Sequence, residues 1–225
     1  MGVIIIIVIA VFIGFVVFNA MMTAKRQKEI ELWAISKGLI FNSAKKYGIN
    51  SYYPQFSCLH QGAKQYAYNI CRGEIQSRHI EAFDYHYETY STNSKGHRQT
   101  HHHYFSAVII ESGLPLKPLF MRPERFFDKL AEFVGYDDID FESAEFSRKF
   151  YVKANDKRWA YDVIHQRTME FLLGMPQYTI QFGHNAVIAY RSTTFGVADF
   201  EAAFQVILGI LERLPEYVVK QLKGN

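Results

Sequence analysis

The sequence has few cysteines and few prolines, the residues in which disulfide-rich proteins and proline-rich linkers abound. It contains two cysteines, Cys58 and Cys71, and six prolines in 225 residues. Two cysteines cannot cross-link a chain of this length, which excludes a disulfide scaffold. Aromatic residues make up 16% of the chain, and this apolar surface excludes intrinsic disorder. We therefore expect a folded chain with reduced cysteines.

The sequence also lacks the common signatures of enzymes. It has no glycine-rich phosphate loop, no G-x-S-x-G elbow and no H-E-x-x-H motif. The acidic run at 137–142 lacks the glycine and ligand spacing of an EF-hand. Cys58 stands two residues before His60, but adjacency in sequence does not predict a catalytic pair. Cys71 lies in an apolar run and is expected to pack as a small hydrophobic side chain.

Charge is absent from the first 24 residues. Only Gly2, Gly14 and Asn19 interrupt the hydrophobic run that ends at Met22. A helix over 2–22 would be about 30 Å long, the thickness of the hydrocarbon core of a bilayer. A cleaved signal peptide is the alternative, but it would need a cationic segment before the apolar run. We expect residues 1–24 to be an uncleaved transmembrane signal anchor.

Three cations follow the anchor at once, namely Lys25, Arg26 and Lys28. The positive-inside rule then predicts a single-pass protein of the cell inner (plasma) membrane, with its N-terminus outside and its C-terminal domain cytoplasmic. Without these three, the 25 basic residues of the chain fall to 22 and match its 22 acidic residues. A balanced body argues against nucleic acid as a partner. We expect the three cations to determine topology and to contact the lipid bilayer weakly.

Hydrophobic and turn patterns after the anchor indicate an α+β protein. Residues 25–37 predict a juxtamembrane helical stalk, and 38–225 a single soluble domain. Segments 66–72, 78–90 and 102–111 are rich in aromatic and β-branched residues and predict an antiparallel β-meander, followed by a short strand at 119–122.

Helices are expected to pack over this meander. Pro123 and Glu124 predict the start of a helix that ends at Gly135, and 146–152 alternates like a strand. A helix from Asp156 to 173, a hairpin of 178–182 with 186–190, and a long C-terminal amphipathic helix over 199–222, kinked at Pro215, complete the expected domain.

The most unusual local feature is the run of histidines at 101–103. In a strand, His101 and His103 share one face while His102 points to the other. If the hairpin closes over the turn at 92–96, His86 and Glu88 come near the first pair, and two imidazoles with a carboxylate can bind zinc or another transition metal. A slip of one residue would separate them. The alternative is a solvated polar hairpin end with no cofactor.

The run from Phe83 to Tyr87 is also rich in groups that can transfer protons. Asp84, His86 and Glu88 alternate along one strand face, where a histidine oriented by a carboxylate could act as acid or base. The simpler interpretation is a two-sided strand, with its aromatic residues in the core and its polar residues outside.

The order of short motifs resembles a family. An FDY-x-Y strand at 83–87, an F-x-x-PE helix start at 120–124 and a DIDF segment at 138–141 followed by Phe146-Ser147 stand after one membrane span. This order is similar to that in uncharacterised bacterial single-pass membrane-anchored proteins with no known function. The resemblance implies a bacterial inner-membrane protein and supplies no site residues.

Two kinds of function fit these features. The first is a non-enzymatic, membrane-tethered domain that binds a protein, peptide or small ligand at the cytoplasmic face, where tethering raises its local concentration. A variant of it is an accessory subunit whose span contacts the spans of membrane-protein partners near Gly14. The alternative is a tethered metal-binding protein, or a metal-dependent hydrolase, that uses the histidine-rich hairpin.

Overall fold

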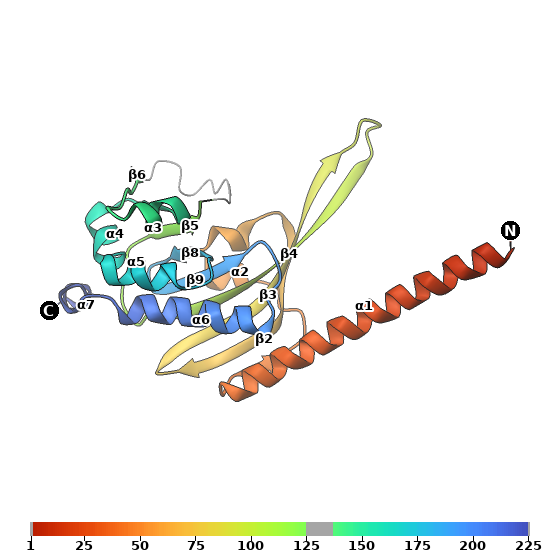
Figure 1. Ribbon diagram of the computed structural model, residues 1–225, viewed down its shortest axis with the longest axis horizontal. Helices are drawn as coiled ribbons and strands as arrows, with labels where there is room; N and C mark the ends of the chain where they lie inside the picture. Colours follow the sequence, from red (N-terminus) through yellow and green to blue (C-terminus); the bar gives the residue numbers. More distant parts are fainter. Residues whose placement is uncertain (1, 125–136, 225) are drawn as a thin grey trace.

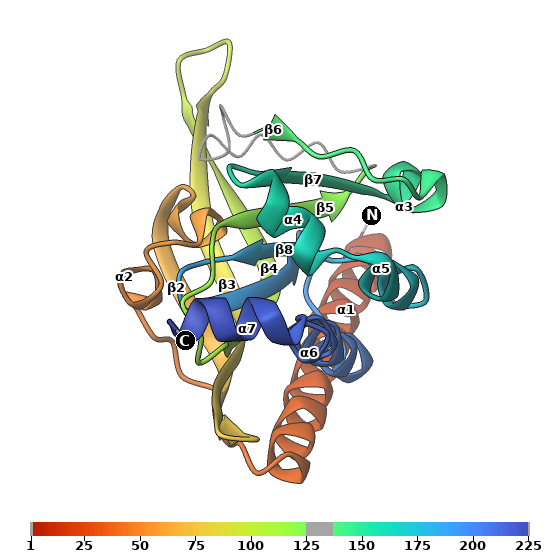
Figure 2. The same ribbon diagram turned by 90° about the vertical axis from the view of Figure 1, so that its left-hand side faces the viewer.

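The computed structural model describes residues 2–124 and 137–224 and has the expected α+β fold. Within these residues, nine strands form one antiparallel sheet in the order β1-β2-β3-β4-β9-β8-β5-β7-β6 (Figures 1 and 2). The strands are β1 (Ile40–Asn42), β2 (Ala63–Ile75), β3 (Arg78–Thr92), β4 (Arg98–Glu111), β5 (Leu119–Pro123), β6 (Asp137–Asp138), β7 (Phe150–Ala154), β8 (Thr179–Phe182) and β9 (Ala186–Arg191). The helices are α1 (Gly2–Ser36), α2 (Ile49–Tyr52), the 3-10 helix η1 (Ser57–His60), α3 (Ala144–Lys149), α4 (Lys157–Val163), α5 (Gln166–Leu173), α6 (Val197–Glu212) and α7 (Glu216–Lys223).

Hydrophobic side chains are buried on both faces of the sheet. On one face, the C-terminal part of α1 joins α6, α4 and α5 in a large core that includes Ile30 and Phe200. On the other face, α2 and η1 cover a smaller core that contains Phe56, Phe83 and Tyr85. Successive residues of β3 therefore point into different cores, as the pleat of a strand requires.

The central meander is confirmed by the strand order, and its hairpin is longer than the sequence suggested. β3 pairs with β4 in one unbroken register from Ile80 opposite Ile110 to Thr92 opposite Arg98. The outer part of this hairpin projects beyond the rest of the sheet (Figure 1). There the polar side chains need no core, so their composition gave no strand signal to mark its end.

Several expected helices have different bounds. The strand expected over 146–152 is helix α3 up to Lys149, because Ser143 caps it by accepting a hydrogen bond from the Phe146 N–H. Asp156 caps α4 as expected, but the helix breaks at Ile164 and resumes as α5. The helix expected to start at Pro123 falls mostly on 125–136, outside the described residues.

The long C-terminal helix is two helices. α6 ends at Glu212, and α7 begins at Glu216 directly after Pro215. Proline has no N–H to continue the ladder of helical hydrogen bonds, so the expected kink is a complete break. The hairpin expected over 178–190 forms as β8 and β9.

The N-terminal apolar segment and the residues after it form one helix of 35 residues, α1. This helix is long and apolar enough to cross a membrane, and its most apolar window is not buried by the rest of the protein. In Figure 1 its N-terminal half extends away from the body, while its C-terminal end lies against the sheet and α6.

Candidate functional site

A closed polar network joins α1 to the middle of β3. The Arg26 guanidinium donates hydrogen bonds to both carboxylate oxygens of Asp84, each at 2.8 Å. Its Nε donates to the main-chain oxygen of Phe195, also at 2.8 Å. Asp84 is fully buried, whereas the Arg26 side chain is 27% exposed. Because a planar guanidinium meets a carboxylate through two parallel bonds, this pair fixes the orientation of α1 as well as its position.

The remaining acceptor sites of Asp84 are also occupied. Asn69 Nδ2 donates to Oδ2 at 2.9 Å, and the Ser106 hydroxyl donates to Oδ1. Ser106 in turn accepts a hydrogen bond from the Phe195 N–H at 2.8 Å. Asn69 lies at a β-bulge of β2 with a φ of 49°, a left-handed conformation that asparagine tolerates better than most residues. Four donors around one buried carboxylate satisfy its charge inside the protein.

Hydrophobic packing continues this attachment toward the end of α1. Ile30 and Ala34 are fully buried, and Trp33 stacks on Phe200 of α6 with a centroid distance of 5.6 Å. The Trp33 Nε1–H also donates to Glu201 at 2.9 Å. The stretch that the sequence suggested as a stalk therefore contributes directly to the main core, and α1 leaves the domain as a rigid extension of it.

The three cations expected to determine topology lie in two different environments. Lys25 and Lys28 are exposed and pair loosely along α1 with Glu29 and Glu31. Arg26 instead turns into the domain, where its three side-chain hydrogen bonds are intramolecular. Of the three, Lys25 and Lys28 are thus the side chains placed to reach lipid headgroups.

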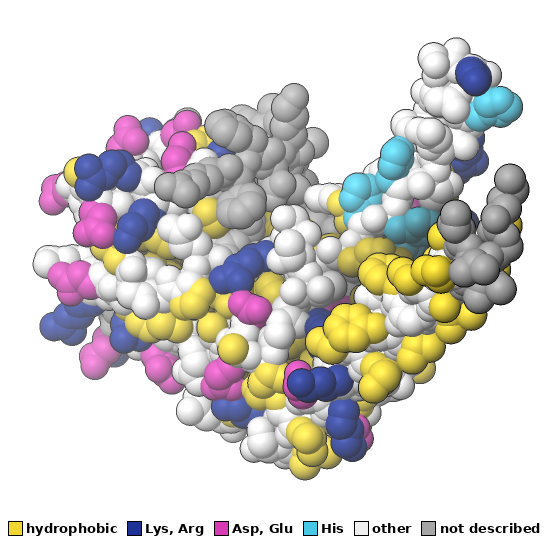
Figure 3. Space-filling view, turned by 45° about the vertical axis from the view of Figure 1, so that its right-hand side comes forward, with side chains coloured by type: hydrophobic (Ala, Val, Ile, Leu, Met, Phe, Trp, Pro, Cys, Tyr) yellow, Lys and Arg dark blue, Asp and Glu magenta, His cyan; other side chains and the backbone are white. Residues whose placement is uncertain are grey.

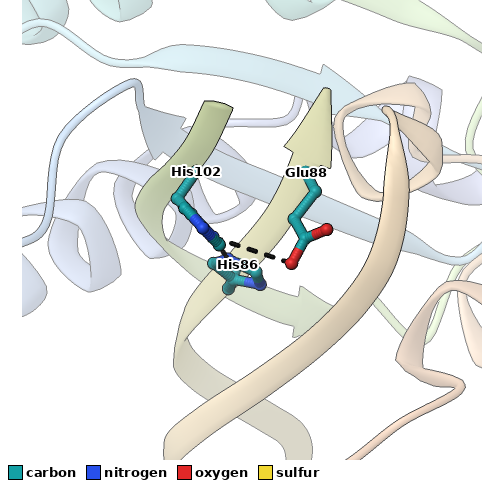
Figure 4. A group of neighbouring side chains, drawn as sticks. All are labelled: His86, Glu88 and His102. Carbon is teal, nitrogen blue, oxygen red and sulfur yellow. Dashed lines mark hydrogen bonds and ion pairs between the residues drawn. The ribbon is translucent and has the colours of Figure 1, made fainter. Parts of the chain in front are cut away.

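A second polar cluster lies farther along the same face of β3. His86, Glu88 and, from β4, His102 converge there (Figure 4). His102 Nδ1 lies 3.0 Å from His86 Nε2 and 3.7 Å from Glu88 Oε1. One ligand atom from each residue lies within 4.8 Å of the other two. His86 and Glu88 are buried, while His102 is exposed.

These distances suit a small transition-metal ion. Ligand atoms about 2.0–2.2 Å from a tetrahedral zinc ion lie about 3.3 Å from one another, between the 3.0 and 3.7 Å observed. Two imidazoles and a carboxylate are also the donor types that zinc accepts. The exposed side of His102 leaves access for a further ligand.

The charges around this cluster have opposing effects on metal binding. Burial lowers the pKa of His86, and the neighbouring His102 acts in the same direction, against the Lys64 main chain. The neutral imidazole that results is the form that binds a metal. A hydrogen bond from the Tyr90 hydroxyl lowers the pKa of Glu88, and Lys64, whose Nζ lies 3.1 Å from the carboxylate, adds to this. Because the Lys64 side chain is 70% exposed, it can turn away into solvent when a cation binds.

The register corrects the set of ligands expected from the sequence. It places Glu88 opposite His102, and it places His101 and His103 on the other face of the hairpin. His101 contacts the Ser91 hydroxyl at 2.7 Å, and His103 contacts that of Thr89 at 2.8 Å. His102 therefore takes the place expected for His101 and His103, because a shift of one residue in register moves every side chain to the other face of the strand. The length of the turn could have predicted this register. A five-residue turn over 93–97 pairs 92 with 98, and counting back along both strands then pairs Glu88 with His102.

Comparisons with known proteins bear on the fold. No protein-family model and no curated protein matches the chain. Among solved structures, it is similar to the crystal structure of the mycobacterial trehalose monomycolate transport factor A, TtfA, with a TM-score of 0.61. The match covers 84% of this chain and 96% of TtfA at 10% sequence identity. At this identity, the likeness shows the fold alone.

Proposed function

We propose that this chain is a non-enzymatic accessory protein of the bacterial inner membrane, with its N-terminus outside and its domain at the cytoplasmic face. The observation that supports this most is the network of Arg26 and Asp84, which fixes the span to the sheet. A flexible linker would be enough to raise the local concentration of a binding domain. A rigid junction also fixes which face of the domain meets a membrane neighbour, as an accessory subunit requires.

We infer that the partner is an integral membrane protein that contacts both the span and the domain. The structural neighbour TtfA is a transport factor, which agrees with an accessory role beside a membrane transporter. On α1, apart from the helix itself, no atom of the described residues lies within 4 Å of the position that a side chain at Gly14 would occupy. A second helix can therefore approach closely there. Val11 and Phe18 lie on the same side of the helix, one turn before and after it.

Site-specific photo-crosslinking in intact membranes tests this proposal. A photoreactive residue at Val11 or Phe18 is expected to form an adduct with one defined membrane protein. The matched control positions, Phe12 and Val16, lie on the opposite side of α1 and are also exposed. They are expected to react with lipid. Lipid adducts alone at all four positions would contradict the proposed partner.

Orientation is tested separately by fusing a reporter that is active only in the cytoplasm to the C-terminus. Exposed Lys25 and Lys28 predict an active reporter. An inactive reporter in a fusion that accumulates normally would reverse the proposed topology.

We propose metal binding as a second function, supported by the cluster of His86, Glu88 and His102. The full chain, purified in detergent without a histidine tag, is equilibrated with Zn²⁺ and its metal content is measured. His102→Ala is expected to lower the zinc affinity by at least about 10-fold. Loss of a residue that only hydrogen-bonds to a ligand already costs about 10-fold or more, and loss of a ligand itself should cost at least as much. His101→Ala is the matched control, because it removes an adjacent exposed histidine from the opposite face. Equal losses in the two variants, or no zinc in the parent, would refute the site.

A further inference from the structure

The outer end of the β3–β4 hairpin is a two-stranded projection with its own ordered turn. β2 pairs with β3 only as far as Glu88, and β9 pairs with β4 only as far as Ser106. Beyond them, 89–92 pairs with 98–101, and within the described part of the chain no third strand joins them. At the tip, the Asn93 side chain accepts hydrogen bonds from the N–H groups of Lys95 and His97. The tip is thus a defined structure that extends about 13 Å beyond the last residue that β2 supports.

This projection carries positive charge and no negative charge. The sequence contains no aspartate or glutamate between Glu88 and Glu111. Lys95 and Arg98 lie in this interval and are exposed, together with His97 and His101. The Arg98 guanidinium stacks on the ring of Tyr90, 3.5 Å from its centroid, which holds this cation in place. On a body whose other charges nearly balance, the tip is a local cationic surface.

The junction with α1 decides where this surface lies. Arg26 stands four residues after Met22, the end of the apolar run, which is about 6 Å along the helix. It binds Asp84 at that point. From Asp84, eight residues of β3 lead to Thr92, about 26 Å along the strand. The hairpin and the N-terminal half of α1 project from the same side of the body (Figures 1 and 3). A strand that starts so near the membrane and extends toward it can reach the bilayer surface when the span tilts.

The hairpin cannot enter the hydrocarbon core. Among the residues that the structure describes, no strand pairs with either outer edge of the hairpin, and such edges are not tolerated in lipid. Its cations would also be costly there. The headgroup layer suits it, because phosphates pair with Lys95 and Arg98 while exposed tyrosines such as Tyr90 and Tyr104 are the residues found at membrane interfaces.

We propose that the tip of the β3–β4 hairpin, through Lys95 and Arg98, binds the anionic lipid headgroups of the leaflet that faces the domain. With the Arg26–Asp84 junction, this gives the domain two points of contact with the membrane. The span then tilts until the tip rests on the surface, within the range of tilts that transmembrane helices show. This proposal rests on the proposed membrane span, and the experiment below distinguishes a failure of the span from a failure of the lipid contact at the tip.

The experiment places a fluorophore at the tip of the full chain through Ser94→Cys. The native cysteines, Cys58 and Cys71, are buried and do not compete for the label. The labelled protein is reconstituted into vesicles of phosphatidylcholine, with or without phosphatidylglycerol, that contain a quencher attached to the lipid headgroup. Strong quenching is expected in the anionic vesicles and weak quenching in the neutral ones.

The variant Lys95→Gln/Arg98→Gln removes the charge of the tip. Each cation near an anionic surface accounts for about a fivefold change in binding, so the equilibrium between the bound and the free tip is expected to shift about 30-fold toward the free tip. The matched control, Lys220→Gln/Lys223→Gln, removes two exposed cations of α7, at the end of the body far from the hairpin (Figure 1). It is expected to quench like the parent.

The outcomes distinguish the two proposals. Protein that fails to float with the vesicles would overturn the membrane anchor. Protein that floats, but whose tip is quenched equally in neutral and anionic vesicles, would overturn the lipid contact. Quenching that the charge removal leaves unchanged would overturn it too.

Discussion

Replacing Arg26 by alanine tests whether α1 is structurally coupled to the sheet. The change removes three hydrogen bonds at once, two to Asp84 and one to the Phe195 main chain. Among the described residues, Asn69 and Ser106 then remain as the hydrogen-bond donors to the fully buried carboxylate. Two neutral donors do not balance a buried negative charge, so the folded state loses stability that the unfolded chain does not.

The magnitude follows from the burial of the pair. Breaking a buried ion pair by removing one partner costs about 3–5 kcal/mol. The Arg26 side chain is 27% exposed, so water can enter the space it leaves, and we expect about 3 kcal/mol. For a domain of this size, that loss corresponds to a decrease in Tm of about 6–12 °C.

Urea unfolding of the full chain in detergent measures this loss. Trp33 and Trp159 are both buried, and the Trp33 fluorescence reports on the contact between α1 and α6. Lys28→Ala is the matched control on the same helix, because its pair with Glu31 is solvent-exposed. It is expected to change the free energy of unfolding by less than about 1 kcal/mol.

A double-mutant cycle identifies the partner. Asp84→Asn is expected to destabilise the protein as well, because it removes the charged acceptor of Arg26. The double variant should lose at least about 1 kcal/mol less than the sum of the two single losses. Additive losses, or a loss from Arg26→Ala as small as that of the control, would refute the reasoning.

Three further predictions concern individual side chains. Although burial opposes it, a hydrogen bond from Lys37 lowers the pKa of Glu201. The charged carboxylate should therefore stabilise the docking of α1 above about pH 4.5, and this stabilisation should disappear as the pH falls through the folded pKa. Urea titrations at several pH values should show a smaller decrease in stability at low pH for Glu201→Gln than for the parent. Burial raises the pKa of Cys71 to about 12, so this thiol should react with maleimide only after unfolding, and fast labelling of the native protein would contradict its burial. Gly62 has a φ of 63° and lies against the main chain of Glu88, so Gly62→Ala should destabilise the protein by at least about 1–2 kcal/mol in the same urea assay, and an unchanged midpoint would show that the turn is not constrained.

Much of the local structure could be predicted because it depends on neighbouring residues. The apolar run from Gly2 to Met22, the cap of α4 and the helix ends at Gly174 and Pro215 follow from side-chain and backbone chemistry within a few residues. The alternation along 78–90 predicted β3 and which of its faces is aromatic. The polar residues expected outside, Asp84, His86 and Glu88, are instead buried, because α1 and the neighbouring strands supply their partners.

The metal cluster was predicted only in part, for a reason of register. The sequence placed His86 and Glu88 on one strand face correctly, since this needs only the period of a strand. Choosing His102 over His101 and His103 needs the pairing of two strands, which the length of the turn and the core contacts decide together.

Arg26 shows most clearly what the sequence alone determined and what tertiary structure decided. By sequence it belongs with Lys25 and Lys28 as a cation next to an apolar run, and this composition determined that the chain carries a candidate membrane anchor. Its partner, Asp84, stands 58 positions away, and only the packing of α1 on the sheet brings the two together. The local pattern is set by short-range sterics and hydrophobicity, whereas a long-range ion pair exists only once burial has removed the competing water.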